Sequence, residues 1–152
     1  MPRELTRVLL ARTAPNLPPA LADGLVLQTE PPARRLQLRR SLPDAPTDLV
    51  ALLAAQPAPE QPPAYLAQGD ALAGFLLPRA AAVSNADDRP APAVLVQIFG
   101  SGPPAEWWMR LGWPSPAELQ KDWTAAYAAR RAATRMPLMF LNESASPPAK
   151  GD

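Results

Sequence analysis

The sequence predicts an α+β fold whose core is a mainly antiparallel sheet of about six to seven short strands. Three observations predict it: short segments alternate apolar and polar residues, residues 94–99 form an apolar run, and helical patterns are confined to a few segments. Alternation is typical of strands, whereas amphipathic helices repeat every 3.6 residues. We expect the sheet to be covered by a short helix and a C-terminal helix pair.

The expected strands are short and are separated by proline-rich segments. In chain order they lie at residues 6–12, 24–30, 35–42, 65–68, 71–77, 94–99 and 138–141. The second and third alternate on either side of a proline pair, which predicts a β-hairpin. Its solvent-exposed face would carry Arg35, Gln37 and Arg39. Proline cannot donate to a sheet's hydrogen-bond ladder, so the prolines are expected to end strands.

Three helices are expected. The first, at residues 42–56, has Asp44 as its predicted N-cap. The second contains two adjacent tryptophans and ends at Gly112, a residue suited to the left-handed position after a helix. The third begins after Ser115, the predicted N-cap, and runs over residues 116–135.

Length and composition limit the class of protein. A chain of 152 residues fits one domain, expected at residues 1–141 with a flexible tail at 142–152. The net charge of +1 gives no general attraction to phosphates, and the abundance of alanine, arginine and proline is typical of a bacterial genome of high GC content. No apolar span is long enough to cross a membrane and no signal sequence is evident, so the expected location is cytoplasmic, with no membrane partner.

The chain contains neither cysteine nor histidine. These residues supply the thiol nucleophile, most zinc ligands and the commonest general base, so we expect no metal. No two of the remaining acids, lysines or tyrosines lie on one predicted face beside a nucleophile. The sequence therefore predicts a protein that is not an enzyme.

One turn resembles the dinucleotide-binding turn of flavin and nicotinamide enzymes. It follows the 94–99 run and reads Gly100, Ser101, Gly102, Pro103, Pro104, Ala105. In those enzymes such a turn brings the pyrophosphate to backbone N–H groups at a helix N-terminus. The two prolines here remove two of those donors, and Gly112 interrupts the helix that should follow. We therefore expect no bound cofactor.

The C-terminal helix carries two patterns. Taking Leu119 as reference, one stripe contains Trp123, Ala126, Tyr127 and Arg130, and we expect it to face the sheet. The Arg130 guanidinium is expected to stack on the ring of Trp123 or Tyr127. The opposite face is small and basic, and its expected partner-binding residues are Lys121, Ala125, Ala128, Arg131, Ala132 and Arg135. Small side chains let another helix approach closely, and the basic residues would form a polar rim.

Two functions follow from these surfaces. The favoured prediction is a non-enzymatic protein-binding or assembly module, acting through the C-terminal helix or the hairpin face, with a second copy or another protein as partner. The alternative is binding of single-stranded nucleic acid by the hairpin residues Arg35, Gln37 and Arg39.

Overall fold

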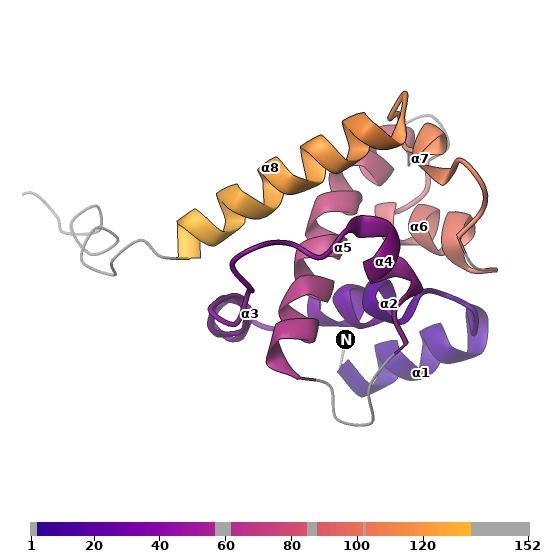
Figure 1. Ribbon diagram of the computed structural model, residues 1–152. Coiled ribbons are helices and arrows are strands. Elements are labelled where there is room, and N and C mark those ends of the chain that lie inside the picture. The colour runs from indigo at the N-terminus through magenta and orange to yellow at the C-terminus, as the bar shows by residue number, and fades with distance from the viewer. Residues whose placement is uncertain (1–2, 57–61, 85–87, 102, 135–152) are drawn as a thin grey trace, which may run out of the picture.

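Helices alone make up the regular structure of residues 3–56, 62–84, 88–101 and 103–134, the part of the chain that the computed structural model describes (Figure 1). In chain order they are α1 (Arg3–Thr13), α2 (Pro19–Leu27), α3 (Pro32–Arg39), α4 (Leu49–Ala54), α5 (Pro63–Ser84), α6 (Ala91–Phe99), α7 (Trp107–Arg110) and α8 (Pro116–Thr134). None of these residues forms a strand. The predicted α+β fold with an antiparallel sheet is therefore wrong.

The 22-residue helix α5 is the central element: α2, α3, α6 and α8 pack against it, and α1 and α4 pack against α2 (Figure 1). Its closest neighbour is α2, and the two helices meet at glycines. A Cβ atom on Gly24 would lie 2.0 Å from the carbonyl oxygen of Gly69, and one on Gly69 would lie 2.8 Å from the oxygen of Ala20. Because no side chain intervenes, the two backbones are in direct contact, and glycine is required at the crossing.

Prolines begin helices here rather than end strands. Pro19 and Pro32 open α2 and α3, each preceded by a second proline at the N-cap, and Pro63 and Pro116 open α5 and α8. The first residues of a helix have no intrahelical acceptor for their N–H groups, and proline's fixed φ suits the first turn. Two proline pairs of the sequence, Pro18–Pro19 and Pro31–Pro32, are therefore helix N-termini.

The segments mistaken for strands are buried or amphipathic helices. Seven of the nine residues of α2 are buried, so its apolar residues surround the helix and leave no 3.6-residue stripe to recognise. The two strands predicted at 65–68 and 71–77 are parts of α5, which also continues into the predicted loop at 80–92 as far as Ser84. A short apolar run does not by itself distinguish a buried strand from a buried helix.

The predicted helices agree with the structure more closely than the predicted strands do. Both C-terminal helices lie where the sequence placed them, as α7 and α8. Gly112 has a φ of +88°, as expected for the residue that ends α7. The helix predicted at 42–56 is confined to α4, and its N-cap is Asp48 in place of Asp44, since the Asp48 carboxylate accepts from the N–H groups of Val50 and Ala51. The strand at 138–141 and the tail at 142–152 lie outside the described residues.

Within the described ranges, no helix is both long enough and apolar enough to cross a membrane.

The two tyrosines, Tyr65 and Tyr127, form a contrasting pair of hydroxyl groups. Tyr127 Oη donates a 2.7 Å hydrogen bond to the carbonyl oxygen of Pro43. The Tyr65 hydroxyl is buried and has no hydrogen-bond partner among the described residues. Burial, helped by the negative charge of Asp23, raises the pKa of Tyr65 to about 12.

The glycine crossing can be tested with Gly24→Ala. On helix propensity alone this change stabilises a helix by up to about 1 kcal/mol. The clash with Gly69 predicts the opposite sign, a loss of about 2 kcal/mol or more in the free energy of unfolding, measured by urea denaturation. Ala125→Gly on the exposed side of α8 calibrates the propensity effect, and a stabilised Gly24→Ala protein would show that the backbones are not in contact.

The tyrosine pair predicts two different outcomes for the same chemical change. Tyr127→Phe should lower the free energy of unfolding by about 1 kcal/mol because a hydrogen bond is lost, whereas Tyr65→Phe should leave it unchanged or raise it. The pKa of the Tyr65 phenol is near 10 in the unfolded chain and about 12 in the folded protein. Its contribution to the free energy of unfolding is therefore complete below pH 10 and is lost between pH 10 and pH 12. Urea denaturation at pH 8 and pH 11 measures both effects; a Tyr65→Phe protein with the parent's pH slope would contradict the assignment.

Candidate functional site

Helix α8 is held to the body by one narrow stripe. Its only fully buried residues are Leu119, Trp123 and Tyr127, spaced four apart. The sequence predicted these three in one stripe together with Ala126, which is exposed instead. Trp123 packs edge-on against Phe75 of α5 with ring centroids 5.3 Å apart. Its Nε1 donates to the carbonyl oxygen of Thr47 at 3.1 Å, so α8 contacts both the central helix and the segment before α4.

The segment at residues 43–49 runs along α8 and is fastened to it by polar contacts. Besides the Trp123 and Tyr127 bonds, Gln120 Oε1 accepts from the N–H of Leu49 at 3.3 Å. Arg131 donates to both the carbonyl oxygen, at 3.2 Å, and the carboxylate of Asp44. These contacts cover one side of α8 and leave the other side bare.

The bare side of α8 is the alanine face, which we define as six of its exposed alanines: Ala125, Ala126, Ala128, Ala129, Ala132 and Ala133. Lys121 is also exposed at its N-terminal end. Five of the predicted partner-binding residues, Lys121, Ala125, Ala128, Ala132 and Arg131, are therefore on α8 as expected, with Arg131 turned toward Asp44. The sixth, Arg135, lies outside the described residues.

A groove adjoins the alanine face where α8 crosses α5. It has a volume of about 300 Å³ and is lined by Ala71, Gly74, Phe75, Trp123, Ala126, Tyr127, Ala129 and Arg130. We call it the aromatic groove. Two of its alanines belong to the alanine face, so the two features form one continuous, mostly apolar surface with a guanidinium at one end.

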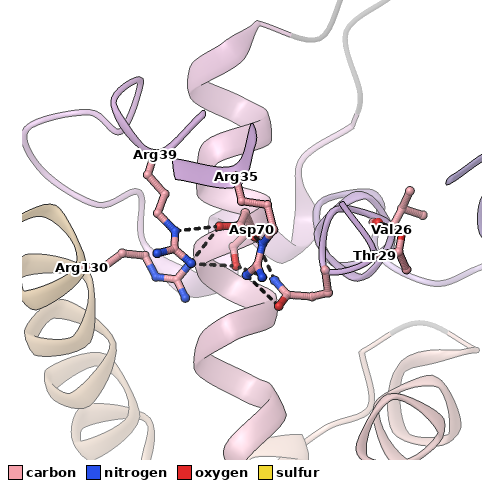
Figure 2. Close-up of polar contacts among 7 residues, drawn as sticks. Val26, Thr29, Arg35, Arg39, Asp70 and Arg130 are labelled. Atoms are coloured by element: carbon pink, nitrogen blue, oxygen red, sulfur yellow. Dashed lines mark hydrogen bonds and ion pairs between the residues drawn. The ribbon is translucent and has the colours of Figure 1, made fainter. Parts of the chain in front are cut away.

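A buried carboxylate in the middle of α5 organises the basic residues of α3 and α8 (Figure 2). Asp70 is completely buried. Its Oδ1 accepts from Arg35 Nε at 3.1 Å, and its Oδ2 from Arg130 Nη1 at 2.9 Å and Arg39 Nε at 3.4 Å. Gln28 Nε2 donates to Oδ1 at 2.9 Å, and Gln28 Oε1 accepts from Arg35 at 2.8 Å. We call this set the Asp70 cluster.

Three guanidinium groups share this single carboxylate, so positive charge exceeds negative charge in a partly desolvated site. Burial lowers the pKa of Arg130 from its ordinary value, and the charges of Arg39 and Arg35 lower it further, while Asp70 opposes them. Space for Arg130 is provided by Gly74, where a Cβ atom would lie 2.1 Å from Arg130 Nη2. The cluster thus joins α2, α3, α5 and α8 through charge-assisted hydrogen bonds.

The predicted hairpin is wrong, and so is the prediction that Arg35 and Arg39 lie on a solvent-exposed face. Residues 32–39 form the helix α3, which turns Arg35 and Arg39 toward Asp70 and leaves Gln37 exposed on the other side. The expected stacking of Arg130 on an aromatic ring is also replaced by its ion pair with Asp70. A helix separates side chains that alternation had placed on one face.

The structural context of the dinucleotide-like turn is absent. The run before it is the helix α6, not a strand, and Gly102 lies outside the described residues. The next helix, α7, has four residues, and its N-cap, Glu106, adopts a left-handed conformation with a φ of 56°. A dinucleotide turn joins a strand to a long helix, so this turn lacks both of its neighbours.

Among the same described residues, no three acids lie close enough together to hold a metal ion. Asp70 is completely buried and enclosed by its partners. The site offers binding surfaces: an apolar groove, a small-residue face and an excess of guanidinium groups.

Sequence reasoning missed Asp70 because two strands were placed on either side of it. Its signal was present, since a lone acid among alanines, glycines and leucines requires a cationic partner if the segment is buried. The exposed apolar stripe of α1, formed by Leu5, Val8 and Leu9, was missed because that segment was also taken for a strand.

Comparison of the chain with protein-family models, with curated proteins and with solved structures found no match.

The Asp70 cluster predicts a large effect of a nearly isosteric change. Asp70→Asn removes the negative charge from three buried or half-buried arginines, so we expect the free energy of unfolding to fall by about 3 kcal/mol or more in urea denaturation. Asp44→Asn is the control, because the Asp44 side chain is 92% exposed and its pair with Arg131 should contribute less than about 1 kcal/mol. Equal losses in the two variants would show that the cluster does not stabilise the fold.

Proposed function

We propose that this protein is a non-enzymatic protein-binding module whose partner docks on the alanine face of α8 and the adjoining aromatic groove. The observation that carries the proposal is that α8 is buried on one side only: three of its 19 residues are buried, while the six alanines of the alanine face are exposed. Figure 1 shows the helix lying across the outside of the body. A continuous exposed apolar surface with a charged rim is typical of a docking site.

The shape of this surface favours a helical partner. Alanine side chains are short, so a second helix can approach α8 closely, and the groove beside it offers Phe75, Trp123 and Tyr127 as larger contacts. Lys121 is exposed near the N-terminal end of the alanine face and would pair with an acidic side chain of the partner. A second copy of the chain and a different protein both remain within the proposal.

Binding of single-stranded nucleic acid is not favoured by the geometry. Two of its three expected contacts, Arg35 and Arg39, form ion pairs with Asp70. A small cavity beside Arg39 is lined by Arg39, Arg40, Leu42, Arg131 and Thr134, and therefore by no described aromatic ring. The cytoplasmic location stays a prediction from the sequence.

The docking proposal is tested by adding charge to the alanine face. Ala128→Glu places a carboxylate at its centre and should weaken partner binding by roughly tenfold or more, since an unpaired charge would be buried in the complex. Light scattering measures self-association, and affinity capture with tagged protein measures other partners. Ala93→Glu at an exposed position of α6 is the matched control. If Ala128→Glu keeps every interaction of the parent, the partner surface lies elsewhere.

A further inference from the structure

A small polar cavity lies beside the Asp70 cluster, at the C-terminal end of α8. Its volume is about 110 Å³, and it is lined by Arg39, Arg40, Leu42, Arg131 and Thr134. Three of the five lining residues carry guanidinium groups, and none is acidic. The cavity could hold a few waters or one tetrahedral oxyanion, since a water occupies about 30 Å³ in the liquid.

The charges around this cavity do not balance. The five arginines of the cluster and the cavity wall are Arg35, Arg39, Arg40, Arg130 and Arg131. The carboxylates paired with them are Asp70 and Asp44. These seven groups therefore carry a net charge of +3, although the chain as a whole has a net charge of only +1. A local excess of this size attracts anions.

Guanidinium donors remain free to bind an anion. Arg39 contacts Asp70 through Nε, and neither of its terminal nitrogens is engaged within the described chain. Arg40 is exposed, and its side chain makes no hydrogen bond or ion pair with any described residue. Two adjacent guanidinium forks therefore face one cavity with donors to spare, and such forks match the oxygens of phosphate.

We propose that Arg39, Arg40 and Arg131 form a binding site for one phosphate group, carried by inorganic phosphate or by a phosphate monoester. A dianion fits the net charge of +3 better than a single carboxylate does. No ring lines the cavity on which a nucleobase could stack, and Leu42 is its one apolar wall, so the site recognises the phosphate and not a base. The site does not include the alanine face, so it goes beyond the protein-docking proposal and does not depend on it.

The experiment is thermal unfolding of the full chain in sodium phosphate and in sodium chloride of equal ionic strength. A ligand that binds only the folded state raises the unfolding midpoint, by roughly 3–6 °C at tenfold excess over its dissociation constant. Arg40→Gln should abolish the phosphate-specific rise without lowering the midpoint in chloride, because Arg40 has no structural partner within the described chain. Arg40→Lys should restore part of the rise, since it keeps the charge and loses the fork.

Arg110→Gln is the matched control: it removes the same charge from an exposed arginine of α7, which lies far from α3 in Figure 1. It should keep the full rise. Equal midpoints of the parent protein in the two salts, or an Arg40→Gln protein that responds to phosphate like the parent, would overturn the proposal.

Calorimetric titrations identify the source of the phosphate. A phosphoserine peptide that binds more tightly than inorganic phosphate, with its unphosphorylated form as blank, indicates a phosphorylated protein; equal affinity indicates free phosphate. Both results support the site if Arg40→Gln weakens them at least tenfold. A single-stranded oligonucleotide that binds more tightly than either ligand and depends on Arg40 would overturn the proposal in favour of nucleic acid.

Discussion

The buried carboxylate of Asp70 is the constraint on which the arrangement of the helices depends. A carboxylate without access to water in the middle of the central helix is strongly unfavourable unless cations and hydrogen bonds surround it. Those groups come from three other helices: Gln28 follows α2, Arg35 and Arg39 belong to α3, and Arg130 belongs to α8 (Figure 2). Helix α3 has no fully buried residue of its own, so these polar contacts are a main reason for its place on the body.

The glycines of α2 and α5 allow the helices to approach closely enough for these polar groups to reach Asp70. Direct contact of the two backbones at Gly24 and Gly69 brings the end of α2, and Gln28 with it, beside the next residue of α5, which is Asp70. One turn further along, Gly74 leaves the room that the Arg130 guanidinium occupies. Close packing and charge neutralisation are therefore coupled along one face of α5, and the small residues that weaken its helix propensity are needed for its contacts.

The sequence predicted a helix correctly where its apolar residues are spaced as one stripe, and failed where they surround the helix. The stripe of Leu119, Trp123 and Tyr127 was recognisable because α8 is buried on one side only, although Ala126, predicted to share that stripe, is exposed. Helices α2 and α5 are buried on several sides and carry no clear stripe, so their apolar runs were read as strands. The Asp70 cluster could not be assembled from sequence, because its arginines lie 31 to 60 residues from the carboxylate.

The arginines also outnumber what stabilisation of Asp70 requires. One guanidinium and one amide can satisfy a carboxylate's charge and several of its lone pairs, whereas three guanidinium groups leave uncompensated positive charge. Burial lowers the pKa of Arg130, and the charges of Arg39 and Arg35 lower it further. Such repulsion opposes folding unless an anion offsets it. The arginine whose terminal nitrogens remain free, Arg39, lines the cavity beside the unpaired Arg40. The surplus charge is thus concentrated where a ligand can reach it, which links the stability of the cluster to occupancy of the cavity.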